Sequence, residues 1–169
     1  AASGAGRPAM MELEETTKDW AAGRKIKPKV FPYQLAMNLF CHNAPIGPNG
    51  YNTEEMKMVK ETHKIFCAAK IRIAATCVRV PVMRAHCESI TLECTRPMTE
   101  QQATKLLKKA PGVQMLDNRK VNRSPQPLDA TGQGDIFVGR IRQDISQPKH
   151  RGLEMFVAGD QILKGAALN

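Results

Sequence analysis

The chain has 169 residues, a formal net charge of +9 and a hydrophobic content of 42%. This length is enough for one domain with a buried core and short for two ordinary domains. No stretch approaches the roughly 20 consecutive apolar residues of a membrane span, and the opening segment carries acidic side chains in place of the apolar block of a secretory signal.

Two helices are expected in the N-terminal half. Pro8 suits the first turn of a helix, because the N–H that proline lacks has no partner there, and the acidic and apolar residues that follow predict a helix to about Trp20. Thr53 is expected to cap a second helix that begins at Glu54. Side chains repeat at helical spacing along this second helix and predict one buried face: Met56, Val59, His63 and Phe66.

Strands are expected in much of the remaining chain. Residues 70–82 and 88–96 are interpreted as neighbouring strands of one sheet. In the second of them, Ile90, Leu92 and Cys94 alternate with polar residues, which predicts one buried face. Three further strands are expected, over residues 110–117, 136–144 and 152–159.

Two more helices are predicted in the C-terminal half. The segment from Thr99 to Gln102 matches a capping box and predicts a helix to about Lys109. Asp160 is expected to cap a final helix over residues 161–169. Because the connections between the strands are short, we predict an α+β fold with a mixed, largely antiparallel sheet and helices packed on one face.

The five cysteines show no C-x-x-C spacing. Zinc-ligand spacing is therefore absent, and we predict no metal site. An odd number of cysteines does not suit a disulfide framework, so we expect a reducing compartment, with most of these residues as small buried apolar side chains: Cys41, Cys67, Cys77, Cys87 and Cys94.

The positive charge is scattered, and aromatic residues make up only 5% of the chain. A basic chain suits nucleic acid, an acidic membrane surface or an anionic substrate. Binding of single-stranded nucleic acid relies on aromatic stacking in a basic groove, which this composition does not favour. We therefore expect neither nucleic acid nor a membrane as the partner, and composition alone does not identify the partner.

Four polar residues are candidates for binding a ligand or for catalysis. Arg79 lies between two valines of an apolar segment, where a guanidinium needs an anion, either a protein carboxylate or a ligand. His86 follows near the strand end and suits a structural or an acid/base role. Glu54 and Lys57 share a helix face, as ordinary solvated pairs also do.

Glycine-rich segments give weaker signals. Ser3 and Gly4 precede a helix N-terminus, which suits either a plain helix entry or contact with a phosphate or amide. The sequence "GQG" at Gly132 to Gly134 lacks the third glycine of a dinucleotide fingerprint and lies in a polar loop. These residues taken one by one leave the function open.

Taken together, five segments of the sequence resemble one family. The segments "AASGAG", "NGYNTEEMKMVKET", "ATCVRVPVMRAHCES", "VGRIRQD" and "FVAGDQILKGAALN" resemble the C-terminal catalytic and dimerisation domain of aspartate-β-semialdehyde dehydrogenase. The resemblance covers nearly the whole chain in order, and the motifs are similar to those of the plant and algal branch of the family. It implies an oxidoreductase that interconverts aspartyl phosphate and aspartate semialdehyde with NADP, in the biosynthesis of lysine, threonine, methionine and isoleucine.

The resemblance also implies roles for single residues. His86 matches the acid/base, and Arg79 matches the residue that binds the α-carboxylate of the substrate. Glu54 matches the contact with the substrate amino group, and Lys57 matches the phosphate-binding lysine. Cofactor contacts are implied for three residues: Ser3, Gly4 and Gln161. A homodimer or homotetramer is implied as the assembly.

Parts of the family pattern have no match in this chain. The nucleophilic cysteine in its asparagine–cysteine context, the substrate-orienting glutamine and the glycine-rich Rossmann domain are missing from the sequence, and Cys87 beside His86 is interpreted as structural. We therefore expect residues 1–169 to be the C-terminal catalytic and dimerisation domain of a larger enzyme, and to be inactive in isolation. The alternatives are a catalytically inactive interaction module and a basic nucleic-acid binder. A plant or algal source would place the enzyme in the plastid stroma, and any other source in the cytoplasm.

Overall fold

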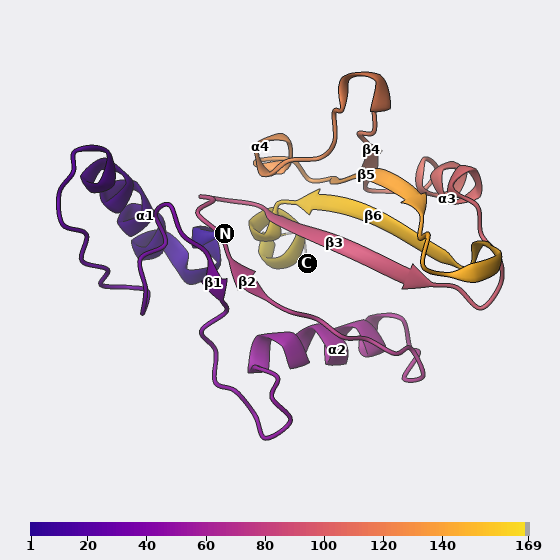
Figure 1. Ribbon diagram of the computed structural model, residues 1–169, viewed down its shortest axis with the longest axis horizontal. Helices are drawn as coiled ribbons and strands as arrows, with labels where there is room; N and C mark the ends of the chain where they lie inside the picture. Colours follow the sequence, from indigo (N-terminus) through magenta and orange to yellow (C-terminus); the bar gives the residue numbers. More distant parts are fainter. Residues whose placement is uncertain (168–169) are drawn as a thin grey trace. The chain divides into compact units, whose positions relative to one another are not determined.

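The computed structural model describes the backbone of residues 1–167 and the side chains of residues 1–164. The chain divides into two compact units, Ala1–Met83 and Arg84–Asn169 (Figure 1). Each unit contains its own buried apolar cluster. The expectation of a single domain over residues 1–169 stays a prediction.

The first unit begins with a short 3-10 helix, Ala2–Ala5, followed by α1, Gly6–Ala21, which confirms the helix predicted from Pro8 to Trp20. The carboxylate of Glu12 on α1 is buried and accepts hydrogen bonds from the backbone N–H groups of Lys29, Val30 and Phe31. These bonds hold residues 29–31, which follow α1, against the helix. The core of this unit consists of Ala2, Ala9, Leu13, Phe31, Leu35 and Ala36.

The helix α2, Thr53–Ile65, begins one residue earlier than predicted, and its cap is Asn52 instead of Thr53. The side chain of Asn52 accepts from the N–H of Glu55 at 2.9 Å, and the carboxylate of Glu55 accepts from the N–H of Asn52 at 3.0 Å. This reciprocal pair satisfies two donors at once, which a cap at Thr53 does not achieve.

The buried face predicted for α2 is only half-buried. Met56, Val59 and His63 are partly covered, whereas Phe66 is 65% exposed. The prediction was wrong for Phe66, which is the C-terminal cap of the helix: its N–H still donates to the carbonyl of Thr62, but its side chain stays exposed.

Two short strands complete the first unit. β1, Phe40–Cys41, pairs antiparallel with β2, Val78–Arg79, so that Phe40 lies opposite Arg79. The strand predicted over residues 70–82 is therefore reduced to two residues, and it does not neighbour the strand predicted over 88–96, which belongs to another sheet. One reason is that the N–H of Cys77 donates to the side chain of Glu55 and not to a strand, although its carbonyl still accepts from His42 next to β1.

The second unit is built on a four-stranded sheet in the order β3-β6-β5-β4 (Figure 1). The pairs β3/β6 and β6/β5 are antiparallel, and β4/β5 is parallel, which confirms a mixed, largely antiparallel sheet in an α+β fold. The strands are β3, His86–Glu93; β4, Val113–Met115; β5, Ile136–Gln143; and β6, Gly152–Gly159.

Helices surround this sheet. α3, Glu100–Leu107, begins with the predicted capping box between Thr99 and Gln102. Its Ala103 packs in a core formed with Val138, Ile141, Leu153 and Met155. The short α4, Pro127–Ala130, contributes Ala130 to a second cluster with Ala85 and Ala158. The expected final helix is a π-helical segment, Ile162–Ala167, and residues 168–169 lie outside the described chain.

A β-bulge shapes the middle of β5. The register between β5 and β6 shifts between Gly139 and Arg142, and Arg140 takes a φ of 55°. A bulge lets two residues oppose one on the partner strand and so changes which side chains face inward. Ile141 is consequently 1% exposed and packs in the core.

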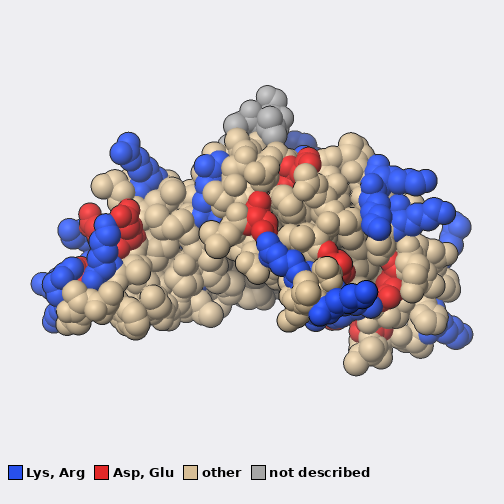
Figure 2. Space-filling model, turned by 90° about the horizontal axis from the view of Figure 1, so that it is seen from above, with Lys and Arg blue, Asp and Glu red and all other residues tan. Residues whose placement is uncertain are grey.

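The surface shows no single charged face in the view of Figure 2. Basic side chains form separate groups there, with acidic side chains and uncharged surface between them. Among the described residues, none of the helices has the length and apolar character needed to cross a membrane.

Candidate functional site

Arg79 on β2 is the most distinctive polar residue of the first unit, because it is a guanidinium that is only 9% exposed. Its Nε donates to Oδ1 of Asn43 at 2.9 Å, and its Nη2 lies 2.9 Å from Nε2 of His42. Its Cζ lies 4.9 Å from the centroid of the Phe31 ring, which places the cation against the face of the ring. Among residues 1–164, no carboxylate forms an ion pair with Arg79.

The two polar contacts leave one edge of the guanidinium available. The Nε–H and one Nη2–H occupy the edge that faces Asn43 and His42. A guanidinium carries five N–H groups, so the edge formed by Nη1 and Nη2 keeps donors for another partner. Burial lowers the pKa of Arg79, and the nearby Glu54 carboxylate raises it. The structure thus holds a largely buried cation between two neutral partners, and its role in binding an anion stays a prediction.

A hydrogen-bond network connects Arg79 to the start of α2. The N–H of His42 donates to the carbonyl of Cys77 at 2.8 Å, and Nδ2 of Asn52 donates to the carbonyl of His42 at 3.2 Å. The carboxylate of Glu55 accepts from the N–H of Cys77 at 3.0 Å. The cap of α2 and the paired strands β1 and β2 are therefore connected by one hydrogen-bond network.

Glu54 and Lys57 lie in the first turns of α2, as predicted. Nζ of Lys57 is 3.3 Å from Oε1 of Glu54, and the two side chains are 55% and 40% exposed. Such a surface pair contributes little to stability. The charge of Glu54 also acts on Arg79 and His42, whose pKa values it raises, so the structure brings Glu54 and Arg79 into one electrostatic neighbourhood.

Ser3 and Gly4 lie in the 3-10 helix that precedes α1. Ser3 is 9% exposed, and its N–H donates to the carbonyl of Met83 at 3.0 Å. Gly4 is exposed and has no side chain, so a flat ring is able to approach the backbone there. The cofactor contact implied for Ser3 and Gly4 stays a prediction.

His86 is the first residue of β3 in the second unit, opposite Gly159 of β6, and its side chain is exposed. The preceding residue, Ala85, is 2% exposed and has a φ of 74°, which is rare for a residue with a Cβ. Because Arg79 and His86 belong to different units, their placement in a shared cleft stays a prediction.

Asp160 connects Arg84, Gly132 and the start of the final helical segment. It is fully buried, and its Oδ2 lies 2.8 Å from Nη2 of Arg84 and accepts from the N–H of Gly132 at 2.7 Å. Its Oδ1 accepts from the N–H of Ile162 at 3.0 Å, which confirms the predicted cap. Burial opposes ionisation of Asp160, but the bonds from Gly132, Arg84 and the helix start outweigh it and lower the pKa.

Gln161, the third predicted cofactor contact, is half-buried and follows Asp160 directly. Cys87, which follows His86, is half-buried, and burial raises the pKa of its thiol. A raised pKa keeps the thiolate scarce, which does not suit a nucleophile. The interpretation of Cys87 as structural therefore has a physical basis.

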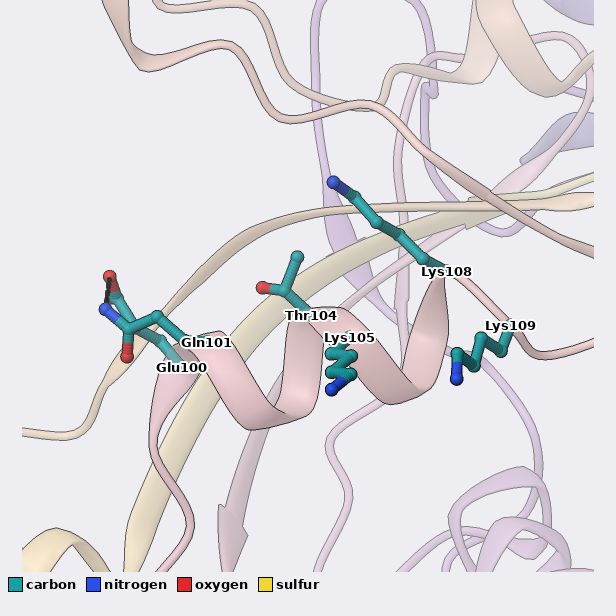
Figure 3. A pocket seen from close by; sticks show the side chains of 6 residues that line it. All are labelled: Glu100, Gln101, Thr104, Lys105, Lys108 and Lys109. Atoms are coloured by element: carbon teal, nitrogen blue, oxygen red, sulfur yellow. Dashed lines mark hydrogen bonds between the residues drawn. The ribbon is translucent and has the colours of Figure 1, made fainter.

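A groove along α3 is lined by none of these predicted site residues (Figure 3). It is lined by Glu100, Gln101, Thr104, Lys105, Lys108 and Lys109. The ammonium groups of its three lysines point in different directions and do not converge on one point. Three solvated lysines arranged in this way do not define an anion site.

The comparisons with known proteins decide the family. Residues 1–164 match the profile described as the semialdehyde dehydrogenase dimerisation domain, a single match that spans both units. The chain belongs to this family. It is 54% identical to aspartate-semialdehyde dehydrogenase of Synechocystis sp. over 99% of this chain and 49% of the relative, and 52% identical to that of Prochlorococcus marinus over 99% and 48%. The chain thus spans about half the length of the curated relatives it matches.

Solved structures agree with this membership. Aspartate semialdehyde dehydrogenase II of Vibrio cholerae, crystallised as a complex with ASA, superposes with a TM-score of 0.93 at 36% identity, over 99% of this chain and 48% of that chain. The α+β fold predicted from the sequence of this dimerisation domain is therefore confirmed.

Sequence reasoning missed several residues around the predicted site. His42 and Asn43 contact Arg79 from positions 37 and 36 residues away in the chain, and no local pattern singles them out. Arg84 and its partner Asp160 are also far apart in sequence. Glu55 was recognisable, because Asn52 followed three residues later by a glutamate is a capping-box pattern.

Proposed function

We propose that residues 1–169 are the C-terminal catalytic and dimerisation domain of an aspartate-semialdehyde dehydrogenase, a phosphorylating oxidoreductase that uses NADP. The observation that carries this proposal is Arg79, a buried guanidinium with neutral partners and one unoccupied edge. A buried cation of this kind requires an anion, and a planar fork suits a carboxylate. Aspartyl phosphate and aspartate semialdehyde each carry an α-carboxylate.

The other predicted residues receive complementary roles in this proposal. Glu54, a carboxylate close to Arg79, contacts the ammonium group of the substrate. Lys57, one turn along α2, binds the phosphate that leaves aspartyl phosphate or enters the reverse reaction. Because Lys57 pairs only weakly with Glu54, at 3.3 Å and largely exposed, its ammonium group exchanges this partner for phosphate at little cost.

His86 is proposed as the acid/base. Its exposed imidazole at the first position of β3 accepts a proton from the nucleophilic thiol of the complete enzyme and returns it when the thiol leaves. Ala85, with a φ of 74°, and the ion pair between Arg84 and Asp160 are proposed to fix the backbone just before this ring. A fixed position is what a proton-transfer group needs.

Cofactor binding is proposed to involve Ser3, Gly4 and Gln161. Exposed Gly4 admits a ring close to the backbone, and Gln161 offers an amide, so these residues suit the nicotinamide amide. When bound, NADPH supplies the hydride that reduces the acyl group. A Rossmann domain N-terminal to this segment in the complete enzyme is proposed to hold the cofactor phosphates.

Self-association is part of the proposal, with a homodimer as the smallest assembly and a homotetramer as the larger one. The family is described by its dimerisation role, and several apolar side chains of the described chain are exposed, among them Leu128 at 86% and Ile145 at 100%. Sedimentation equilibrium of the full-length polypeptide tests this, and a monomer at high concentration contradicts it.

The decisive experiment is an activity assay of the full-length polypeptide that contains this segment. We expect phosphate-dependent oxidation of aspartate semialdehyde with NADP. A folded, self-associating polypeptide without this activity would favour the inactive interaction module instead. We also propose that the enzyme is located in the plastid stroma, or in the cytoplasm in a source without plastids. Imaging of a tagged full-length protein tests this.

A further inference from the structure

The polar contacts of Arg79 are unusual for a buried cation. Taking a guanidinium out of water costs several kcal/mol and is normally compensated by a carboxylate. Here the hydrogen-bonding contacts among residues 1–164 are a neutral amide oxygen of Asn43 and a ring nitrogen of His42, both at 2.9 Å. The first unit thus orients the cation without neutralising it.

We propose that His42 and Asn43 are positioning residues for Arg79, whose neutral acceptors fix the Nε–Nη2 edge of the guanidinium and thereby direct its Nη1–Nη2 edge toward the carboxylate of the substrate. This inference rests on the proposed function, because it requires Arg79 to bind that carboxylate. Neither residue is proposed to touch the substrate.

The contacts of His42 determine its tautomer. Its Nδ1 faces the N–H of Ala44 at 3.2 Å, and its Nε2 faces Nη2 of Arg79 at 2.9 Å. Both neighbours can only donate, whereas a neutral imidazole has one acceptor nitrogen. The shorter, charge-assisted contact to Arg79 is the stronger one, so we assign the lone pair to Nε2; the N–H of Ala44, which points at Nδ1 from 3.2 Å, then finds no acceptor there. Burial and the charge of Arg79 both lower the pKa of His42, which keeps this neutral form.

The backbone of His42 is held on two sides. Its N–H bonds to the carbonyl of Cys77, and its carbonyl accepts from the side chain of Asn52, the cap of α2. The ring is therefore placed by the same network that positions Glu54 and Lys57 on α2. A change at His42 should reach the substrate through the orientation of Arg79.

The neutrality of the acceptors is a specific requirement. A carboxylate at position 43 would bond the same Nε–H but would neutralise the guanidinium and compete with the carboxylate of the substrate. Asn43→Asp should therefore raise KM for aspartate semialdehyde although it adds an ion pair to the protein. A merely structural role for Asn43 predicts no such increase.

The test compares three variants of the full-length enzyme: His42→Leu, which removes the acceptor; His42→Gln, which restores one at the reach of Nε2; and His63→Leu as a matched control. His63 is another histidine of the same unit, and its Nε2 contacts the carbonyl of Ile71 at 2.7 Å. Each is assayed with aspartate semialdehyde and with 3-aminopropanal, the same molecule with hydrogen in place of the carboxylate. Circular dichroism confirms that each variant is folded.

For His42→Leu we expect kcat/KM on aspartate semialdehyde to fall on the order of tenfold, mainly through KM, because a hydrogen bond to a charged group is lost. His42→Gln should recover most of this, and His63→Leu should resemble the wild type. On 3-aminopropanal, His42→Leu should lie within about twofold of the wild type, since no carboxylate is present to be misaligned.

Two outcomes overturn the inference: an equal loss on both substrates, or no loss on either. The proposed function fails separately, if the wild-type enzyme does not oxidise aspartate semialdehyde or if Arg79→Lys leaves kcat/KM on it unchanged.

Discussion

Arg84 and Asp160 form an ion pair of 2.8 Å in which the aspartate is fully buried, and this pair joins the residues just before β3 to the residue just after β6. The same carboxylate accepts backbone N–H groups from Gly132 and Ile162. Three segments of the second unit therefore converge on one negative charge. His86, two residues from Arg84, begins the strand that this arrangement anchors.

Asp160→Asn should destabilise the second unit. The amide loses the charge that holds Arg84 and turns an N–H group toward one of the existing donors, and breaking a buried pair costs on the order of 3 kcal/mol. Thermal unfolding followed by circular dichroism measures this. Asp135→Asn is the matched control, because among the described side chains Asp135 accepts one bond, from Gln114, that an amide oxygen can also accept. Equal unfolding temperatures for the two variants would contradict the prediction.

Acid should remove this same contribution. The folded-state pKa of Asp160 is lowered, so its contribution to stability is present above the unfolded value of about 3.9 and is lost as the pH falls through the folded value. The difference in unfolding free energy between the wild type and Asp160→Asn should shrink below about pH 4.

Local signals in the sequence were sufficient for several elements. The capping box at Thr99 and Gln102 and the helix after Pro8 depend on residues close together in the chain, and both are present. The cap of α2 was misplaced, although Glu55, three residues after Asn52, carried the signal. This signal is local, so the position of the cap does not depend on tertiary structure.

Other features depend on contacts that no local pattern contains. The two strands predicted as neighbours belong to different sheets, because β3 pairs with β6, more than sixty residues further along, whereas β2 pairs with β1. The contact between His42 and Arg79 likewise arises only when β1 and β2 pair. The resemblance to a family indicated Arg79 and His86, but only the structure shows what holds Arg79.

The stability of the first unit should depend on pH through His42. Its folded-state pKa is lowered by burial and by Arg79, against smaller opposing effects of Glu54 and Glu55. The neutral form is therefore favoured in the fold, so its contribution is full above the unfolded value of about 6.5 and is lost as the pH falls through the folded value.

The single tryptophan offers a probe for this effect, because Trp20 lies in the first unit. Urea unfolding followed by its fluorescence should show the wild type losing stability below about pH 6.5 relative to His42→Gln, which has no proton to gain at this site. Parallel pH curves for the two proteins would show that His42 does not titrate differently in the fold.

Residues 1–169 alone should not turn over aspartate semialdehyde. Covalent catalysis requires a thiolate at the acyl carbon, and the cysteine beside His86 is half-buried with a raised pKa. We expect no NADP-dependent oxidation by the purified chain, with the full-length polypeptide as the positive control. Robust turnover by the 169-residue chain would mean that one of its own cysteines acts as the nucleophile.

Arg79→Lys should impair substrate binding although the charge is kept. An ammonium group does not form two parallel bonds to one carboxylate, nor does it bond Asn43 and His42 along one edge. The loss of a charged hydrogen bond costs about 1.5–3 kcal/mol, or roughly tenfold to a hundredfold in kcat/KM. Steady-state kinetics of the full-length enzyme measure this, and we expect the change mainly in KM.

His86→Asn should have the opposite kinetic signature. Asparagine keeps a polar side chain of similar reach but does not transfer a proton, so kcat should fall by about two to four orders of magnitude. KM should change little, because Arg79, Glu54 and Lys57 lie in the other unit and keep their contacts. Measured side by side in the full-length enzyme, the two variants separate binding from chemistry. If Arg79→Lys were silent while His86→Asn mainly raised KM, the two roles would have to be exchanged or abandoned.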